Sequence, residues 1–477
     1  MDYKIKIDNI GKLKEANISV RSLTILAGLN NTGKSFFSKT LYSVFNAMNT
    51  NPVLVQIQYC LKRLQESSER IERNIFITSI KMREEQKSNE KNNKQNQKPI
   101  RLAARSLKEC YFLISKKEDQ IFTSIRNDFK INDTDIIKAI NKVVELYTQL
   151  LNTISNEEEI NEIKKSTSTL KKLIDSNSEK VIAQGFNRAL ETNLTGNFQI
   201  PNLQDLKRDK KKSAFIDIVN VGKVTINGNK VETKILPTGL SELQSKSRVV
   251  YIESPFYWKL RNALSRATRS HFLFNSTKRR SLLVPKYFNN LDLMLMDELS
   301  GEMAFPDIFK DLTTKIIKGK LITDESGTLK FKELKGNKLH SLPMTATGIV
   351  QLGMLALLIE KKVLDKNSVL FIDEPETNLH PAWQVKMMDI LFQLVKAGVH
   401  VITATHSPDI LKWLEVHLKS HPEDTDLIAL NQMEAHEDST VSVVDPDRDV
   451  LKKIIDIKNN LTDPFLDLFL KSQQENK

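Results

Sequence analysis

The residues whose spacing most specifically indicates chemistry lie near the start of the chain. Gly28 and Gly33 are separated by four residues and followed by Lys34 and Ser35, which fits G-x-x-x-x-G-K-[ST]. Backbone amides of such a loop surround phosphates, the lysine reaches the β- and γ-phosphates, and the serine binds Mg²⁺. Only 15 of the 477 residues are glycine, so motif glycines are poorly explained by chance. We predict that ATP and Mg²⁺ bind at Gly28, Asn30, Asn31, Thr32, Gly33, Lys34 and Ser35.

Two adjacent acids follow an apolar run late in the chain. Residues 368–372 read SVLFI, and Asp373 and Glu374 come directly after them. An aspartate at such a strand end can hold Mg²⁺, and the next carboxylate can polarise an attacking water molecule. Such runs often simply end a strand, but here the chain continues PETNLHP over 375–381, which makes the pattern specific. We therefore predict Asp373 as a metal ligand and Glu374 as a catalytic residue.

A histidine follows the next apolar run. Residues 399–403 read VHVIT, and His406 lies three residues beyond them in the segment THSP. A histidine at a strand terminus can contact a γ-phosphate and respond to its loss. The alternative is a histidine that only caps a helix or sits in a loop. In the company of the other two motifs, we predict that His406 is catalytic.

The order of these motifs resembles the ABC-type ATPase heads of the SMC/RecF/OLD class, over roughly residues 1–50 and 340–415. The resemblance implies that Lys34 and Ser35 belong to Walker A, Asp373 to Walker B, and that Glu374 and His406 are the catalytic glutamate and the switch histidine. It also matches residues 376–381 to the D-loop. Heads of this class form composite sites, so it implies a homodimer or higher oligomer bridged by ATP.

The segment expected to meet the nucleotide of the partner subunit departs from the pattern of the class. Residues 345–351 read TATGIVQ, which retains Thr347 and Gly348 but lacks the strict Ser-Gly-Gly. We assign both residues to cofactor binding and predict slow hydrolysis. The alternative is an ordinary N-capped core helix. Gln199 is one candidate for the Q-loop glutamine, and a surface glutamine is an equal reading.

These motifs lie at the two ends of the chain, with a different pattern between them. From about residue 53 to 190, glycine and proline almost vanish and leucine, isoleucine and lysine recur at helical spacing. We predict an α/β fold, a P-loop ABC-type ATPase head with a long helical insertion. The expected segments are 1–52 and 341–477 for the head, 53–197 for the insertion, and 198–340 for a β-hairpin and a basic lateral segment.

Positive charge is concentrated in one stretch of a chain whose formal net charge is +12. Between residues 254 and 291 there are eight bases and no acid, with aromatic residues interleaved. Bases attract phosphates and aromatic rings stack on unpaired nucleobases, so DNA or RNA is one partner. An acidic protein and a solvated face with core aromatics remain the alternatives. The nucleic-acid candidates are Lys259, Arg261, Arg266, Arg269, Lys278, Arg279 and Arg280.

Several classes of protein are excluded or disfavoured by what the sequence lacks. No run approaches about 18 apolar residues, so no membrane span is expected. Two cysteines cannot form a disulfide framework, and we expect a cytoplasmic, reduced protein. Only 71 residues follow His406, so we expect no built-in nuclease. The acids Asp445, Asp447 and Asp449 read as a turn and a helix N-cap.

The resemblance extends to function. Heads with helical insertions and no nuclease domain are similar to the ATPase subunits of bacterial anti-phage systems such as Septu and PARIS. This implies an ATP-driven sensor or scaffold that controls a separately encoded effector nuclease or toxin. The alternative is a RecF/SMC-like ATPase of DNA repair or chromosome maintenance, which clamps DNA on ATP-driven dimerisation. A transporter ATPase is disfavoured by the missing strict signature and by the insertion.

Overall fold

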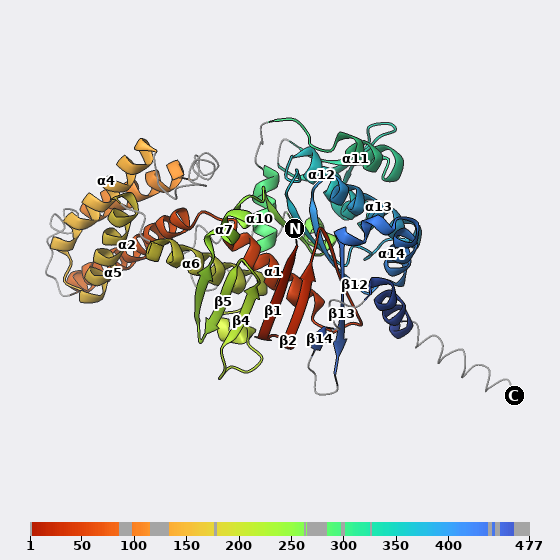
Figure 1. Cartoon of the computed structure of the whole chain (residues 1–477). Coiled ribbons are helices and arrows are strands. Elements are labelled where there is room, and N and C mark those ends of the chain that lie inside the picture. Colours follow the sequence, from red (N-terminus) through yellow and green to blue (C-terminus); the bar gives the residue numbers. More distant parts are fainter. Residues whose placement is uncertain are drawn as a thin grey trace. The chain divides into compact units, whose positions relative to one another are not determined.

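The computed structural model divides the chain into two compact units. The head unit comprises Met1–Asn49 and Leu190–Lys477, and the helical unit comprises Thr50–Ala189. Figure 1 shows the elements of both units in sequence colours. The structure describes residues 2–84, 98–114, 133–175, 179–261, 264, 284–296, 301–324, 327–436, 441–443 and 449–461. Among these residues, none of the helices combines the length and apolar character needed to cross a membrane.

An 11-stranded sheet organises the head unit, in the order β6-β5-β4-β1-β2-β14-β13-β3-β12-β11-β7. Its strands are β1 (Tyr3–Ile10), β2 (Leu13–Val20), β3 (Leu23–Ala27), β4 (Ala214–Ile218), β5 (Gly222–Asn227), β6 (Lys230–Ile235), β7 (Val249–Ile252), β11 (Val369–Asp373), β12 (His400–Thr405), β13 (Ile428–Ala435) and β14 (Val441–Val443). The expected α/β fold is confirmed. Strands from both ends of the chain lie side by side in one sheet.

The parallel half of the sheet carries the motifs. Strands β13, β3, β12, β11 and β7 pair in parallel, in that order. Every residue of β3, β7, β11 and β12 is buried, as expected when helices cover both faces of a parallel sheet. Short apolar runs therefore predicted these strands well, with ends within a residue or two.

The antiparallel half is built from alternating residues. In β1 and β2, inward residues are buried and their neighbours are exposed, which is the pattern of a sheet with one solvated face. The expected hairpin is present, since β5 and β6 pair antiparallel around Asn227 and Gly228. Gly228 has a φ of +58°, a conformation that suits a tight hairpin turn. Strand β2 was not predicted, because its apolar residues are interrupted by Glu15 and Asn17.

Helices pack on this sheet and position the motif loops. Helix α1 begins at Lys34 and contacts β7, β11 and β12. Helix α12 is buried on nearly all sides, which explains its continuous apolar sequence. The helices of the head unit are α1 (Lys34–Met48), α7 (Pro237–Gln244), α8 (Pro255–Lys259), α10 (Lys286–Met296), α11 (Pro306–Lys310), α12 (Thr347–Glu360), α13 (Pro381–Lys396), α14 (Pro408–Ser420) and a helix over residues 450–461.

A second, three-stranded sheet lies within the stretch expected to be a basic lateral segment. Strands β8 (Gly319–Thr323), β9 (Leu329–Glu333) and β10 (Leu339–Ser341) form it, and β8 packs on α12. No sequence pattern indicated this sheet, because its strands are short and lysines interrupt the apolar residues of β8 and β9.

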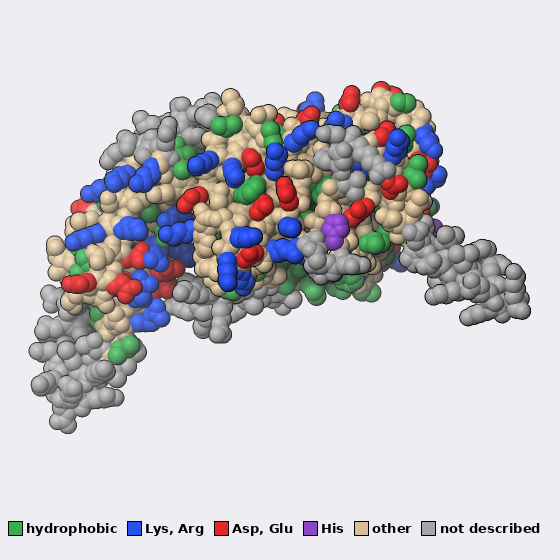
Figure 2. Space-filling model, turned by 60° about the horizontal axis from the view of Figure 1, so that its bottom comes forward, with side chains coloured by type: hydrophobic (Ala, Val, Ile, Leu, Met, Phe, Trp, Pro, Cys, Tyr) green, Lys and Arg blue, Asp and Glu red, His purple; other side chains and the backbone are tan. Residues whose placement is uncertain are grey.

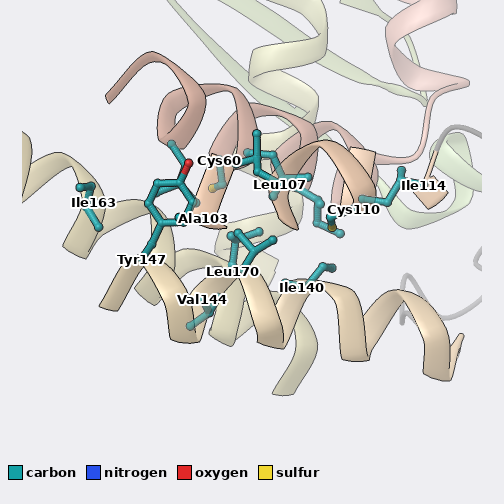
Figure 3. Packing of buried hydrophobic residues seen from close by; sticks show 14 of the residues in the cluster. Cys60, Ala103, Leu107, Cys110, Ile114, Ile140, Val144, Tyr147, Ile163 and Leu170 are labelled. Carbon is teal, nitrogen blue, oxygen red and sulfur yellow. The ribbon is translucent and has the colours of Figure 1, made fainter. Parts of the chain in front are cut away.

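The helical unit has a hydrophobic core of its own. Its helices are α2 (Pro52–Glu84), a helix over 98–114, α4 (Thr134–Leu150) and α5 (Glu157–Asp175), and α6 (Glu179–Phe198) contains the boundary at residues 189 and 190. Figure 3 shows Cys60, Leu107, Cys110, Tyr147 and Leu170 gathered in this core. Burial raises the pKa of both cysteine thiols to about 12, so they pack as small apolar side chains.

Candidate functional site

The sheet brings the three predicted motifs to one edge. Strand β12 lies between β3 and β11, and all three run in the same direction. The phosphate loop (residues 28–35) follows the carboxyl end of β3, and His406 follows that of β12. Strand β11 ends at Asp373, and Glu374 comes directly after it. Ligands of open α/β sheets bind at this edge. We call it the carboxyl edge.

The two glycines of the phosphate loop are required for different reasons. A Cβ on Gly28 would lie 2.3 Å from the carbonyl oxygen of Met433, so β13 approaches too closely for any side chain. Gly33 has open space around it but a φ of +78°, which a residue with a side chain adopts only at a cost. The loop shape therefore depends on both positions.

Lys34 lies at the centre of this loop. It is 6% exposed, and its Nζ donates to the carbonyl oxygens of Gly28 at 2.9 Å and Leu29 at 2.7 Å. Burial lowers the pKa of its amine, while three acids at the neighbouring strand ends act in the opposite direction. The lysine is therefore within electrostatic reach of the predicted metal and catalytic carboxylates.

The other loop residues serve different purposes. The buried Thr32 hydroxyl donates to the carbonyl oxygen of Leu29 at 2.8 Å, so this side chain braces the loop. Asn31 is exposed, has a φ of +68° and accepts a hydrogen bond from Lys12. Asn30 is exposed and Ser35 is half-buried in the first turn of α1.

Asp373 is almost entirely enclosed. It is 2% exposed, and its Oδ2 accepts a hydrogen bond from the hydroxyl of Tyr251 at 2.6 Å. Its Oδ1 is buried and has no hydrogen-bond partner within the part of the chain that the structure describes. Burial raises the pKa of Asp373 to about 6, against the lowering effect of the Tyr251 hydrogen bond. A buried carboxylate with one unpaired oxygen is prepared for a cation.

Glu374 has an unusual backbone conformation. Its φ is +49°, in the left-handed region that costs a residue with a side chain about 1–2 kcal/mol. Its N–H donates to the carbonyl oxygen of Ala404 on β12 at 2.9 Å, and its Oε2 accepts from Thr377 at 3.1 Å. This local geometry turns the side chain out of the strand direction at the carboxyl edge.

Glu376 links this turn to His406. Its Oε1 accepts hydrogen bonds from the Thr405 hydroxyl at 2.7 Å and from the main-chain N–H of His406 at 2.9 Å. The Nδ1 of His406 lies 3.6 Å from Glu376 Oε1 and 3.8 Å from Glu374 Oε1. The predicted histidine and glutamate therefore do lie together, and Glu376 holds the histidine backbone in place.

The residues at this edge fit a magnesium ion. Hydroxyl and carboxylate oxygens are the ligands that Mg²⁺ prefers, and Ser35 and Asp373 supply one of each. The unpaired Oδ1 of Asp373 is the observation that supports the fit. In a nucleotide complex the remaining ligands come from phosphate and water.

The segment expected to meet a partner subunit has an explanation within the chain. A Cβ on Gly348 would lie 2.9 Å from Leu379 and 3.0 Å from the carbonyl oxygen of Asn378. Close packing against the predicted D-loop therefore favours glycine here. Thr347 is half-buried in the first turn of α12, and no side chain caps that helix. A contact of these two residues with a nucleotide stays a prediction.

The role of Gln199 as the Q-loop glutamine stays a prediction, although the ring of its neighbour Phe198 lies 4.6 Å from that of Phe36, which follows the phosphate loop. Gln199 follows α6 with a φ of +53°. The residue that follows β7, the strand beside β11, is Glu253, which pairs with Lys39 and accepts a hydrogen bond from Tyr287. The sequence interpretation therefore missed Glu253, although an apolar strand that ends in an acid was a usable signal.

The described part of the basic segment contradicts one nucleic-acid candidate. Arg261 is 4% exposed and its guanidinium pairs with Asp292, so it is not available to a phosphate. Lys286 is half-buried and donates to Asn193 at 2.6 Å, and desolvation lowers its pKa to about 8. Lys259 is half-buried. The candidates Arg266, Arg269, Lys278, Arg279 and Arg280 lie outside the described residues.

The interleaved aromatics of this segment are largely core residues. Trp258, Tyr287 and Phe288 are each at most 3% exposed, and the rings of Trp258 and Phe288 lie 4.9 Å apart. On the face shown in Figure 2, basic and acidic side chains are interspersed. In the described region the reading as a solvated face with core aromatics is therefore favoured over base stacking.

A cavity of about 250 Å³ borders the phosphate loop. It lies between Gly28, Leu29, the end of β13 and the helix over residues 450–461. That helix begins after Asp449, whose Oδ1 accepts from Lys452 N–H at 2.9 Å, so the predicted N-cap is confirmed. No sequence motif marked these late elements as neighbours of the loop.

Comparison with known proteins assigns the chain to a family. No curated protein sequence matches it significantly. The SMC head domain from Thermotoga maritima matches at 9% identity over 94% of this chain and 99% of its own, with a TM-score of 0.34. The Smc head domain with an extended coiled coil bound to the C-terminal domain of ScpA, from Pyrococcus furiosus, matches at 11% identity over 93% of this chain and 96% of its own, with a TM-score of 0.37.

A family model described as AAA ATPase domain matches residues 1–411. Since that range is most of the chain, the protein belongs to the AAA ATPase domain family, which indicates ATPase activity.

Proposed function

We propose that this protein is an ATP-driven sensor or scaffold that controls a separately encoded effector nuclease or toxin in bacterial anti-phage defence. In this proposal it acts in the cytoplasm, binds ATP with Mg²⁺ and hydrolyses it slowly. The observation that carries the nucleotide part is the convergence of Lys34, Asp373, Glu374 and His406 at the ends of three adjacent parallel strands.

Each residue at the carboxyl edge has a chemical task in this proposal. Backbone amides of the phosphate loop and the Lys34 amine bind the phosphates, whose negative charge favours the protonated amine. Ser35 and Asp373 hold Mg²⁺, which neutralises charge that develops on the phosphates. Glu374 polarises the attacking water, and His406 responds to the γ-phosphate.

Two observations support slow turnover in an ATP-bridged oligomer. The strict signature is missing from residues 345–351, and Gly348 packs against its own chain. Glu374 and His406 are nevertheless present and lie near each other. We propose that binding of ATP joins two heads, and that hydrolysis separates them at a low rate.

The helical unit supports the role of a scaffold. It has its own hydrophobic core, so it is more than a connection between two strands. ATP can influence an effector only if the effector binds the two nucleotide states with different affinity. We propose that the helical unit and the residues around the basic segment make that difference.

The alternative function is a RecF/SMC-like ATPase that clamps DNA. Its support was the basic segment, where Arg261 is buried and pairs with Asp292, and the half-buried Lys286 donates to Asn193. The described residues of this segment therefore give little support to nucleic-acid binding, and the DNA clamp ranks second.

The nucleotide part is tested by Lys34→Ala. Loss of charge-assisted hydrogen bonds to the phosphates, each worth about 1.5–3 kcal/mol, should weaken ATP binding by roughly 100-fold or more in calorimetry. Lys246→Met is a matched control, because Lys246 is equally buried and burial also lowers its pKa, but it precedes β7 at the opposite edge. Equal ATP affinity for wild type and Lys34→Ala would rule out the proposed site.

The partner is tested by co-purification with the product of the neighbouring gene. We expect a complex whose mass, measured with and without ATP, changes with the nucleotide state. The DNA clamp would be supported instead if wild-type protein binds ATP but forms no complex with the product of the neighbouring gene, and hydrolyses ATP faster when DNA is added.

A further inference from the structure

The two oxygens of the Asp373 carboxylate are treated differently by the fold. The Tyr251 hydroxyl donates to Oδ2 at 2.6 Å, whereas Oδ1 has no hydrogen-bond partner among the described residues. The Ser38 hydroxyl lowers the pKa of this carboxyl, but its Oγ is likewise buried without a hydrogen bond of normal geometry. The carboxylate is 2% exposed, so water does not compensate the difference. One oxygen is held by the protein, and the other is left for a ligand.

Sheet register explains why Tyr251 is in this position. Strands β7 and β11 run parallel, with Tyr251 opposite Phe371. Because side chains alternate along a strand, Tyr251, Phe371 and Asp373 emerge on the same face of the sheet. The phenol therefore extends along that face toward the carboxyl edge and reaches the aspartate from the neighbouring strand.

The tyrosine ring has little freedom to turn away. It is 1% exposed, and its centroid lies 5.2 Å from that of Tyr42 and 4.6 Å from that of Tyr287. The ring of Phe371 stacks on it at 6.2 Å. Rings enclosed in this way keep their rotamers, so the hydroxyl is a fixed donor.

A fixed neutral donor orients a carboxylate without cancelling its charge. The nearest charged donor, Lys39, is instead paired with Glu253, which also accepts from the Tyr287 hydroxyl. Groups that hydrogen-bond a metal ligand in this way commonly change metal affinity by about 10–100-fold when removed.

We propose that Tyr251 is a positioning residue for Mg²⁺, which fixes the rotamer of Asp373 so that Oδ1 is presented to the metal of the bound nucleotide. This inference rests on the proposed ATP and Mg²⁺ site and adds a residue that lies outside every motif. A merely structural tyrosine would affect stability alone, whereas a positioning residue affects metal affinity separately from nucleotide affinity.

The test measures Mn²⁺ binding, by electron paramagnetic resonance of free Mn²⁺, to full-length protein saturated with a non-hydrolysable ATP analogue. Tyr251→Phe should bind Mn²⁺ about 10-fold more weakly than wild type, with analogue affinity in chelator unchanged. Tyr42→Phe is the matched control, since Tyr42 belongs to the same ring cluster but its hydroxyl accepts from Asn290. It should bind Mn²⁺ like wild type.

The outcomes separate this inference from the proposed function. Wild type that binds neither analogue nor Mn²⁺ overturns both. Wild type that binds both, with Tyr251→Phe within twofold of Tyr42→Phe, overturns only the role of Tyr251. Should Tyr251→Phe fail to fold, Tyr251→His retains a neutral N–H donor and should stay within about threefold of wild type. A folded histidine variant that binds Mn²⁺ no better than Asp373→Ala would overturn the role.

Discussion

The two edges of the parallel sheet carry the same residue types and use them in opposite ways. At the carboxyl edge lie a lysine, an aspartate and a histidine, Lys34, Asp373 and His406. At the amino edge, before or at the start of β7, β11 and β12, lie Lys246, Asp365 and His400, with Ser247 and Ser368 between them. Composition alone does not tell the two sets apart.

The hydrogen bonds do tell them apart. At the amino edge, the Ser368 hydroxyl donates to Asp365 at 2.7 Å, and the Ser247 hydroxyl hydrogen-bonds with both of these residues. The Nζ of Lys246 lies 3.2 Å from the Nε2 of His400. The Nδ1 of His400 is buried without a hydrogen-bond partner among the described residues, but the other groups bond to one another and join the starts of neighbouring strands. At the carboxyl edge, buried atoms of Asp373, Glu376 and His406 have no hydrogen-bond partner among the described residues.

Unpaired buried polar atoms are costly, so a fold retains them where a ligand completes them. Glu374 adds backbone strain at the same place. The comparison teaches that a functional edge is recognised by buried polar atoms that lack hydrogen-bond partners. A structural edge is recognised by polar groups that are mostly bonded to one another.

Removing the catalytic carboxylate should have the largest effect. Glu374→Gln should lower the ATP hydrolysis rate by about 100–1,000-fold, because an amide is a poor base for the attacking water. ATP affinity should stay close to that of wild type, and light scattering should show an ATP-bound dimer. Asp365→Asn at the amino edge is the control and should hydrolyse ATP normally. Hydrolysis at the wild-type rate by Glu374→Gln would remove that residue from the mechanism.

Much of the carboxyl edge was predictable because phosphate and metal chemistry needs particular residues at short, local spacing. Lys34 and Ser35 follow a glycine-framed loop, and Asp373 and Glu374 follow four buried apolar residues. Short apolar runs at 368–372 and 399–403 likewise indicated the neighbouring strands β11 and β12. The alternation around Asn227 predicted a hairpin for the same local reason.

Contacts between distant parts of the chain could not be predicted in this way. The role of Tyr251 depends on β7 lying beside β11, which are more than a hundred residues apart. Glu376 was assigned to a matched motif, but its bonds to Thr405 and His406 need the turn after β11 to meet β12. Arg261 looked uncompensated because its partner, Asp292, follows the acid-free stretch by one residue.

The buried bonds of Glu376 provide the next test of the carboxyl edge. Glu376→Ala removes the acceptor for the Thr405 hydroxyl and the His406 N–H, which should lower the free energy of unfolding by about 2–4 kcal/mol in urea titrations. It should also lower kcat about 10-fold, with KM changed less than twofold, because the histidine backbone loses its support. Glu376→Gln keeps an oxygen acceptor and should be much milder in both measurements. Equal effects of the two variants would show that the charge of Glu376, and not its acceptor geometry, matters.

The smallest expected effect belongs to the amino edge and depends on pH. Burial, reinforced by the charge of Lys246, lowers the pKa of His400 to about 3, whereas an unfolded histidine has a pKa of about 6.5. Above pH 6.5 both states are neutral and this group contributes its full stability. As pH falls below 6.5 the unfolded state takes up a proton that the folded state does not bind, so stability is lost by up to about 1.4 kcal/mol per pH unit until about pH 3.

Urea unfolding at pH 7.5 and 5.5 should therefore show about 1.4 kcal/mol more loss of stability for wild type than for His400→Gln, which cannot titrate. Identical losses would place a charged His400 in the folded state, and the amino edge would then need a partner for that charge, as the carboxyl edge needs one for Asp373.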